Sequence, residues 1–378
     1  MVGVYFKSRR IAYYISDYGY GHATRSIAII RELVTKTWVS EVIVCTSFSM
    51  QLMMQSLAKE SDQKLQFRTV KNDIGYVLRK GSVEVDIEGL NLEYDRFVDS
   101  FPEALREEQR FLQEKKVDLV ISDIPPIPLL AARSLGIPTI GISNFTWYTA
   151  YQGLISESKL RILAECYQAI DYFAALAGAN EPLWSTYSGR YDFFCRRSDE
   201  LEVQRLRSRI NPDGDKRIVY FGMGMKMDLA ALSSLKLWGN ENCAFIVSSN
   251  IQVTRPHVYQ IPNPYTETQN MIAASDIVIS KAGWGIISEA MVSDKPMVLL
   301  DRRQLNEDHQ TLAFLEKQDR CMILPWEDIC NLSLDDDVLH HLSFQIGKDS
   351  RPNKEDAIHR LVDTIENFNP WRKGGAVI

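Results

Sequence analysis

The chain has 378 residues, of which 45% are hydrophobic and 24% are charged, and its formal net charge is −6. This length suits two domains of ordinary size, each with its own hydrophobic core. An extended nucleic-acid-binding surface needs clustered basic residues. The acidic balance therefore predicts no nucleic-acid partner.

The cysteines and the apolar runs bear on the compartment. Six cysteines with no C-x-x-C pair predict free thiols in a reducing environment rather than a zinc or redox site. The basic N-terminus leads into a short apolar run at 11–15, and no apolar stretch approaches the roughly 20 residues of a membrane span. We expect a cytoplasmic protein without a signal peptide, and peripheral contact with a membrane stays open.

In the first half of the sequence, short apolar runs alternate with helical patterns, which predicts a parallel sheet flanked by helices. The predicted strands are 11–15, 41–46, 118–122 and 137–142. The predicted helices are 25–34, 50–59, 103–114 and 126–135. Residues 61–100 are polar and glycine-containing and predict irregular structure, whereas 147–178 has a helical pattern rich in large apolar residues.

Residues 181–216 are polar and irregular and predict a linker. A second alternating series follows it. Its predicted strands are 217–221, 244–248, 276–280, 296–300 and 321–324, and its predicted helices are 229–237, 268–274, 286–292, 308–317 and 354–368. This order predicts the α/β class, with two tandem doubly wound Rossmann-like domains that face a central cleft. We place the first domain at 1–195 and the second at 196–350. A helix at 351–378 can pack back on the first domain.

A glycine turn, Gly19-Tyr20-Gly21-His22, follows the first predicted strand and opens the first predicted helix. Glycines let the backbone turn sharply, and a helix N-terminus offers free N–H donors to an anion. A dinucleotide site would need a third glycine at Thr24 and an acidic residue after the second strand, where Thr46 stands. The sequence therefore disfavours NAD or FAD.

His22 is the candidate general base. A neutral imidazole at the carboxyl edge of a sheet can accept a proton from a hydroxyl group. Asp123 follows the strand 118–122 at the same edge, and a carboxylate there can fix the imidazole tautomer. The alternatives are a structural histidine and a turn-capping aspartate ahead of Pro125-Pro126.

The second half carries two more glycine turns. Gly222-Met223-Gly224 follows a predicted strand, and Lys281-Ala282-Gly283-Trp284-Gly285 joins another strand to a helix. Backbone N–H groups and Lys281 can hold a diphosphate there. Glu289, on the first turns of that helix, can accept bonds from ribose hydroxyls, or it can simply complement the helix dipole.

Polar side chains at 306–310 begin another predicted helix. They can point toward a ligand and bind sugar hydroxyls, or they can form an ordinary capped helix start.

The run Tyr14–Ser26, with its G-x-G-H-A-T-R element, resembles the opening of GT-B nucleotide-sugar glycosyltransferases, and the same element occurs in the N-terminal half of plant arabinose kinases. The segment Lys281–Gln310 resembles the donor signature of the UDP-glycosyltransferases and of the bacterial lipid-linked N-acetylglucosaminyltransferase. No galactokinase-type segment follows, so we expect that the protein as a whole is not an arabinose kinase.

The resemblance implies a role for each matching residue. His22 is the base and Asp123 its partner, Glu289 binds the ribose, and Asp308 and Gln310 hold the hydroxyls of the donor sugar. The remaining donor-binding residues are glycines and their neighbours: Gly21, Gly222, Gly224, Lys281, Gly283, Trp284 and Gly285. Lys281 departs from the plant signature, which has a histidine there, and His309 separates two residues that plant enzymes have adjacent.

The resemblance thus implies a GT-B glycosyltransferase with an acceptor-binding first domain and a donor-binding second domain. We expect an inverting, metal-independent transfer from a UDP- or dTDP-linked sugar to a hydroxyl of a small-molecule, glycan or lipid acceptor. No cofactor is expected, because the nucleotide sugar is a substrate. The alternatives are a nucleotide-sugar epimerase or hydrolase of the same architecture, and a non-catalytic subunit that binds sugar nucleotides.

Overall fold

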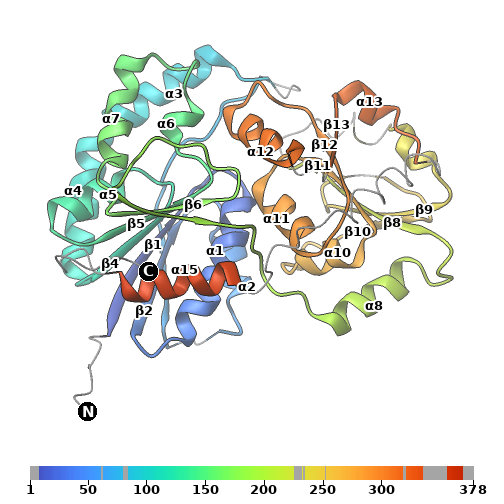
Figure 1. Cartoon of the computed structure of the whole chain (residues 1–378), viewed down its shortest axis with the longest axis horizontal. Coiled ribbons are helices and arrows are strands. Elements are labelled where there is room, and N and C mark those ends of the chain that lie inside the picture. The colour runs from blue at the N-terminus through green and yellow to red at the C-terminus, as the bar shows by residue number, and fades with distance from the viewer. Residues whose placement is uncertain are drawn as a thin grey trace. The chain divides into compact units, whose positions relative to one another are not determined.

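The computed structural model describes residues 8–60, 63–79, 84–224, 232, 235–251, 253–317, 321–334 and 356–368. The chain divides into two compact units (Figure 1). Unit 1 comprises Met1–Val77, Asp86–Asp192 and Glu355–Ile378, and unit 2 comprises Leu78–Val85 and Phe193–Lys354.

Unit 1 is built on one parallel sheet. Its strands are β1 (Arg9–Ile15), β2 (Val39–Thr46), β3 (Leu65–Thr69), β4 (Leu119–Asp123), β5 (Thr139–Ser143), β6 (Tyr172–Leu176) and β7 (Tyr187–Tyr191). Its helices are α1 (Tyr20–Thr35), α2 (Met50–Ser56), α3 (Ile87–Asp99), α4 (Phe101–Glu114), α5 (Ile127–Ser134), α6 (Trp147–Ala150), α7 (Glu157–Tyr167) and α15 (Asp356–Asn367). In the described part of the chain the strand order is β3-β2-β1-β4-β5-β6-β7, so the order reverses between β1 and β4.

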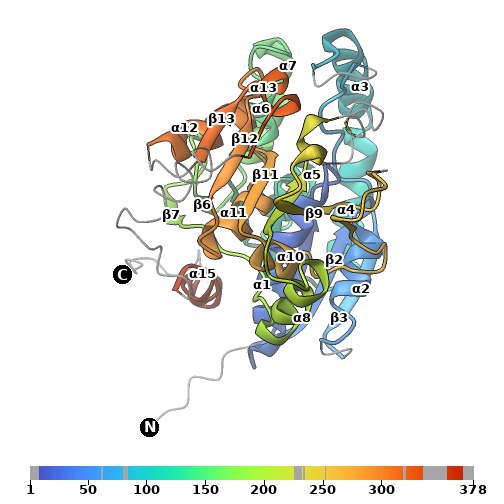
Figure 2. The same ribbon diagram turned by 90° about the vertical axis from the view of Figure 1, so that its right-hand side faces the viewer.

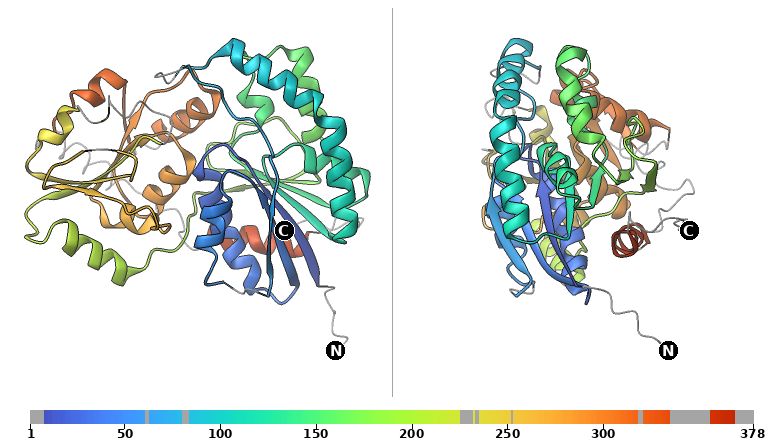
Figure 3. Two further views of the ribbon diagram at one scale, coloured as in Figure 1. Left: turned by 180° about the vertical axis from the view of Figure 1, so that it is seen from behind. Right: turned by 90° about the vertical axis from the view of Figure 1, so that its left-hand side faces the viewer.

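Helices cover both faces of this sheet (Figure 3). Ala12 and Tyr14 of β1 lie in one core cluster with Leu112 of α4 and Ala131 of α5. Tyr13, which points to the opposite face, is 0% exposed and lies near Ser26 of α1. The alternation of side chains along β1 therefore buries both faces, as expected for a parallel sheet.

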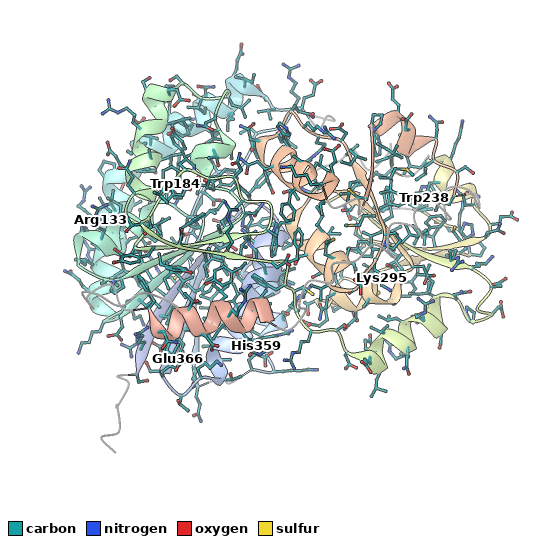
Figure 4. The ribbon with its side chains drawn as sticks, viewed as in Figure 1. Arg133, Trp184, Trp238, Lys295, His359 and Glu366 are labelled. Atoms are coloured by element: carbon teal, nitrogen blue, oxygen red, sulfur yellow. The ribbon has the colours of Figure 1, made fainter. Side chains whose placement is uncertain are left out.

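The last helix, α15, packs in unit 1 beside α1 and β7 (Figure 1). The Arg9 guanidinium donates to the Ile365 and Phe368 carbonyls at 3.1 and 3.3 Å, where a cation complements the helix C-terminus. Tyr191 donates its hydroxyl to Thr364 at 2.9 Å. His359, labelled on α15 in Figure 4, lies 3.8 Å from the Glu32 carboxylate of α1.

Unit 2 repeats the same plan. Its strands are β8 (Arg217–Gly222), β9 (Cys243–Val247), β10 (Val258–Gln260), β11 (Ile277–Lys281), β12 (Met297–Leu300) and β13 (Cys321–Leu324). Its helices are α8 (Glu200–Ile210), η1 (Lys236–Gly239), α10 (Gln269–Ala274), α11 (Trp284–Val292), α12 (Asn306–Glu316) and α13 (Trp326–Cys330). Among the described residues the parallel order is β10-β9-β8-β11-β12-β13, which reverses between β8 and β11.

The core of unit 2 surrounds Trp238, which is labelled in Figure 4. The Trp238 ring lies 5.1 Å from both Phe221 and Phe245 and is 1% exposed. On another side of the sheet, α8 packs along α10 (Figure 2). Both units therefore have the layered α/β organisation of a doubly wound domain.

The predicted fold class, two Rossmann-like domains in tandem, is confirmed. The predicted irregular region at 61–100 is wrong in part, because it contains β3 and α3. The predicted helical region at 147–178 is wrong at its end, where β6 forms a fully hydrogen-bonded inner strand. The predicted linker at 181–216 contains β7 and α8, although the change of unit at Phe193 falls inside it.

Some predictions fall outside the described residues. The predicted helix at 229–237 lies mostly there, and only its last residues are described, as part of η1. Residues 354–355 of the predicted last helix also lie there. The short β10 and α13 were not predicted, because three to five residues give too little periodicity to distinguish them from loops.

Candidate active site

His22 and Asp123 are in contact at the edge of the unit 1 sheet, where the strand order reverses. Asp123 is the last residue of β4 and pairs in register with Ile15 of β1. His22 lies in the first turn of α1, which begins directly after the Gly19 turn. The distance from His22 Nδ1 to Asp123 Oδ1 is 2.9 Å, with the two side chains 5% and 0% exposed. Reversal points of this kind are the usual ligand positions of doubly wound sheets.

Arg25, one helical turn after His22, completes this cluster. Its Nε donates to Asp123 Oδ2 at 2.6 Å, and its Nη2 contacts Oδ1 of the same carboxylate. The remaining donors reach Asn144 Oδ1 at 2.7 Å and Ser143 Oγ at 3.1 Å. Because the Arg25 side chain is 1% exposed, these contacts are made away from water. Arg25 is a structural counterion for the Asp123 carboxylate.

The contacts around Nδ1 of His22 restrict where its proton can reside. Arg25 Nη2 lies 2.8 Å from Nδ1, and Asp123 Oδ1 lies 2.9 Å from it. A protonated Nδ1 donates to Asp123, whereas a bare Nδ1 accepts from Arg25 and cannot also donate. The Nδ1–H tautomer leaves Nε2 bare, and only this form can act as a base through Nε2.

Asp123 is held in its charged form. Burial alone would raise the pKa of Asp123, but the charge of Arg25, the charge of His22 and the hydrogen bonds from both outweigh it, so the pKa lies below its usual value. Asp123 is therefore a carboxylate at neutral pH. In this state it can orient the imidazole and stabilise an imidazolium that forms beside it.

Two further carboxylates hold the loop that precedes His22. Asp17 Oδ1 accepts the backbone N–H groups of residues 47–48 at 2.8 and 2.9 Å. Asp73 accepts the Asp17 N–H at 3.0 Å and the indole N–H of Trp147 at 2.9 Å. Burial, followed by the nearby charge of Asp17, raises the pKa of Asp73 to about 7. This network fixes the glycine turn to the ends of the neighbouring strands.

The corresponding edge of unit 2 carries two glycine turns and a lysine. Gly222, the last residue of β8, pairs in register with Ser280 of β11, and Gly224 has a left-handed φ of 79° that favours glycine. The Lys281 stem crosses this turn, since a Cβ added to Gly224 would lie 3.0 Å from Lys281 Cε. Gly283 occupies the N-cap of α11. A lysine and a helix N-terminus thus lie together at this edge.

Lys281 belongs to a charged group at the ends of β11 and β12. Burial lowers the pKa of Lys281 and the charge of Arg302 lowers it further, while Asp308 and Glu307 oppose this. Arg302 Nε is 2.7 Å from Asp308 Oδ2, and the two side chains are 5% and 2% exposed. An anionic ligand beside Lys281 would favour its charged form.

Glu289, on the second turn of α11, forms a second buried ion pair in unit 2. Arg196 Nη2 lies 2.9 Å from Glu289 Oε1, and the two side chains are 0% and 4% exposed. Burial raises the pKa of Glu289, and the charge of Arg196 opposes the rise. Arg196 comes from the segment that opens unit 2.

The described residues offer neither a metal-binding cluster nor a membrane-spanning helix. No group of three or more His, Cys, Asp or Glu side chains among them is arranged to hold a metal ion. Within the same residues, no helix has both the length and the apolar character to cross a membrane.

Comparison with known proteins identifies a related C-terminal domain and a shared fold. Residues 240–367, which include Lys281, Glu289 and Asp308, match the model of the glycosyltransferase family 28 C-terminal domain. CalG4, the calicheamicin glycosyltransferase, has a TM-score of 0.62 at 11% identity over 95% of this chain and 98% of its own. UGT89C1 of Arabidopsis thaliana complexed with UDP has a TM-score of 0.61 at 11% identity over 95% of this chain and 100% of its own. The chain therefore has the GT-B fold of these glycosyltransferases.

Two curated relatives match parts of this GT-B chain. An L-arabinokinase of Arabidopsis thaliana is 26% identical over 311 residues, 79% of this chain and 28% of that protein. A UDP-N-acetylglucosamine–N-acetylmuramyl-(pentapeptide) pyrophosphoryl-undecaprenol N-acetylglucosamine transferase of Bacteroides thetaiotaomicron is 37% identical over 118 residues, 27% of this chain and 32% of that protein. The chain spans about three-tenths of the length of these relatives.

The structure of this GT-B protein brings some of the predicted site residues together. His22 contacts Asp123, and Gly222, Gly224, Lys281 and Gly283 lie at one edge of the unit 2 sheet. Their roles remain predictions.

Other predicted site residues lie differently. Gly21 and Gly285 are inside the first turns of α1 and α11. Trp284 is 3% exposed and packs on Phe194, with ring centres 5.4 Å apart, so it belongs to the core. Asp308 is paired with Arg302, and Gln310 follows two residues later on α12, half-buried.

The sequence reasoning missed three arginines, and each neutralises a carboxylate that was assigned to the site. Arg25 pairs with Asp123, Arg196 with Glu289 and Arg302 with Asp308. A buried carboxylate needs a cationic partner or a proton, so partners were to be expected. Only Arg25 carries a local signal, since it stands three residues after His22 on the same helix.

Proposed function

We propose that this protein is an inverting glycosyltransferase that moves a sugar from a UDP-linked donor to an acceptor hydroxyl without a metal ion. The observation that carries the proposal is the contact of His22 with an ionised Asp123 at the strand edge of unit 1. The relatives support UDP as the nucleotide, since one is named as a UDP-N-acetylglucosamine transferase and one similar structure is complexed with UDP.

The chemistry follows from the groups present. With Nδ1–H donating to Asp123, Nε2 of His22 accepts the proton of the acceptor hydroxyl as the oxygen attacks the anomeric carbon. The bond from that carbon to the diphosphate breaks, and its electron pair leaves with the nucleotide. Negative charge that develops on the diphosphate is stabilised by the N-terminus of α11 and by Lys281. Attack opposite the leaving group inverts the anomeric configuration.

Donor recognition is assigned to unit 2. Glu289 accepts bonds from the ribose hydroxyls, and Asp308 and Gln310 bind the hydroxyls of the sugar. In this proposal the Arg302 contact holds the Asp308 carboxylate in place while its other oxygen binds the donor. We assign the acceptor to the small molecules, glycans or lipids, because one similar structure is complexed with quercetin and the name of one relative includes a sugar-bearing undecaprenol.

A second candidate is a sugar-nucleotide-binding module that does not transfer sugar. One observation favours it: a match over 311 residues is to an L-arabinokinase, a name that describes a different reaction. Such a module would bind the donor nucleotide and leave the donor intact.

A two-step experiment tests the proposal. Thermal unfolding is first measured with UDP, dTDP and GDP sugars, since a ligand at 100 times its Kd stabilises by about 2.7 kcal/mol. The stabilising donor is then incubated with an acceptor panel of phenols, sugars and polyprenyl phosphates, with and without EDTA, and nucleotide release and products are followed by mass spectrometry.

We expect stabilisation by UDP sugars and acceptor-dependent release of UDP that EDTA does not reduce. Donor consumption without acceptor would favour a hydrolase or epimerase. Stabilisation without any turnover across the panel would favour the binding module. Activity that EDTA abolishes and magnesium restores would contradict the metal-independent mechanism.

A further inference from the structure

The buried ion pair of Arg196 and Glu289 is asymmetric. Glu289 Oε1 accepts from Arg196 Nη2 at 2.9 Å. The other oxygen, Oε2, has no hydrogen-bond partner among the described residues, and it is not among the unpartnered atoms that are closed off from solvent. Glu289 therefore has one oxygen fixed by the protein and one available to a ligand.

Arg196 is itself fixed by the loop that precedes α10. Its Nη1 donates to the Thr266 carbonyl at 2.7 Å, and its Nη2 donates to Thr268 Oγ1 at 3.1 Å. The planar guanidinium is thus held at both ends, which sets the direction of the bond to Glu289. A lysine could supply the charge but not this geometry.

We propose that Arg196 is the positioning residue of the nucleotide site: through Oε1 it holds the Glu289 carboxylate in place and directs Oε2 to the ribose hydroxyls of the donor. This inference rests on the proposed function, because it takes the ligand of Glu289 to be a ribonucleotide. One carboxylate oxygen has two lone-pair positions, so Oε2 can accept from the 2′- and 3′-hydroxyls together.

The charged groups that face Glu289 come from three elements. Arg196 favours the carboxylate form of Glu289, and Glu267 of the loop before α10 disfavours it. Tyr220 of β8 is also near, because the charge of Glu289 adds to the effect of burial in raising the pKa of Tyr220. Burial raises the pKa of Glu289, and Arg196 is the main opposing influence. Without Arg196 the Glu289 side chain would take up a proton at a higher pH and would lose its charge-assisted bonds to the ribose.

The test measures the preference for ribose over deoxyribose as a function of pH. UDP and dUDP are titrated calorimetrically into the wild type, Arg196→Gln and Arg196→Lys between pH 6 and pH 9. The ratio of the two affinities is used because both nucleotides carry the same titrating phosphates, so phosphate ionisation cancels. Arg207→Gln is the matched control, since Arg207 forms another ion pair of unit 2, with Asp276 at 2.9 Å.

For Arg196→Gln we expect the UDP:dUDP affinity ratio to fall by roughly 10-fold near pH 7, the scale of one charge-assisted hydrogen bond. The ratio should climb toward the wild-type value as the pH rises and Glu289 ionises. Arg196→Lys should give a smaller loss with little pH dependence, and Arg207→Gln should keep the wild-type ratio. A ratio that equals the wild-type value in folded Arg196→Gln at every pH would overturn the proposal, since Arg196 would then serve stability alone.

If Arg196→Gln does not fold, Thr268→Val provides the test, because it removes a hydrogen bond from the Nη2 that contacts Glu289. We then expect a fall in the ratio of roughly 2–5-fold, and an unchanged ratio would overturn the proposal. Failure of the proposed function is distinguishable, because UDP would then bind no variant, or Glu289→Gln would itself leave the ratio unchanged.

Discussion

The guanidinium of Arg25 grips the carboxylate of Asp123 at two points, with Nε 2.6 Å from Oδ2 and Nη2 in contact with Oδ1. The same carboxylate holds the imidazole of His22. Asp123 therefore pairs with the positive charge of Arg25 even when His22 is neutral. This arrangement keeps Asp123 ionised in a buried site and makes the His22 tautomer depend on two neighbours rather than one.

The first prediction concerns the base. His22→Ala should lower kcat by roughly 10²–10⁴-fold, the usual size of general-base catalysis, and should leave the Kd for the donor nucleotide unchanged. Steady-state kinetics and calorimetry on the folded variant check this. His359→Ala, which changes a half-exposed histidine of α15, is the control and should retain wild-type turnover. Wild-type turnover in His22→Ala would remove His22 from the mechanism.

The second prediction concerns Arg25. Because the pKa of Asp123 lies below its usual value, the ionised carboxylate stabilises the fold above pH 3.8 and this contribution disappears as the pH falls through the lowered pKa. Arg25→Gln leaves a buried carboxylate without its cation and should cost about 3–5 kcal/mol of unfolding free energy at pH 7. Burial then raises the pKa of Asp123, so the variant should become more stable, relative to the wild type, as the pH is lowered.

Urea unfolding of both proteins between pH 4.5 and pH 8 measures this difference. A constant difference in unfolding free energy across the range would mean that Asp123 does not depend on Arg25 for its charge.

The sequence sufficed for part of this site and not for the rest. His22 and Asp123 could be predicted to meet because each follows a strand, and the two strands are the neighbours at which a doubly wound sheet reverses its order. Arg25 was missed despite its position three residues after His22, because an arginine inside an amphipathic helix is typical of an exposed face. Arg196 lies 93 residues before its partner in a segment that reads as a linker, so only the folded chain brings them together.

The strands of the fold could likewise be predicted only in part. Strands with continuous apolar runs, such as β1 and β11, were predicted within two residues of their ends. The strand β6 was missed because its short apolar sequence follows α7 and continues a helical pattern. The edge strands β3 and β7 were missed because their side chains are mostly exposed or half-buried and therefore show no apolar run.

The third prediction concerns Asp73, whose pKa is raised to about 7. A carboxyl group with a raised pKa contributes stability that is fully present below its unfolded pKa and is lost as the pH rises through the folded value. The free energy of unfolding of the wild type should therefore fall by about 1 kcal/mol between pH 6 and pH 8, which corresponds to a fall of about 2–4 °C in Tm. Asp73→Asn cannot ionise and should lack this part of the decline, which calorimetric scans at the two pH values will show. An equal fall in Tm for the wild type and Asp73→Asn between the two pH values would contradict a raised pKa of Asp73.

The measurement that tests the central claim most directly is the binding of UDP and dUDP to the wild type and to Glu289→Ala. Charge-assisted hydrogen bonds are worth about 1.5–3 kcal/mol each, so the account predicts that Glu289→Ala binds UDP roughly 10–100-fold more weakly and no longer prefers UDP to dUDP. Glu202→Ala is the matched control, since Glu202 pairs with Arg205 on α8, and it should bind both nucleotides as the wild type does. Unchanged UDP affinity and an unchanged preference for the ribonucleotide in Glu289→Ala would contradict the donor site, and with it the proposed transfer from a UDP sugar.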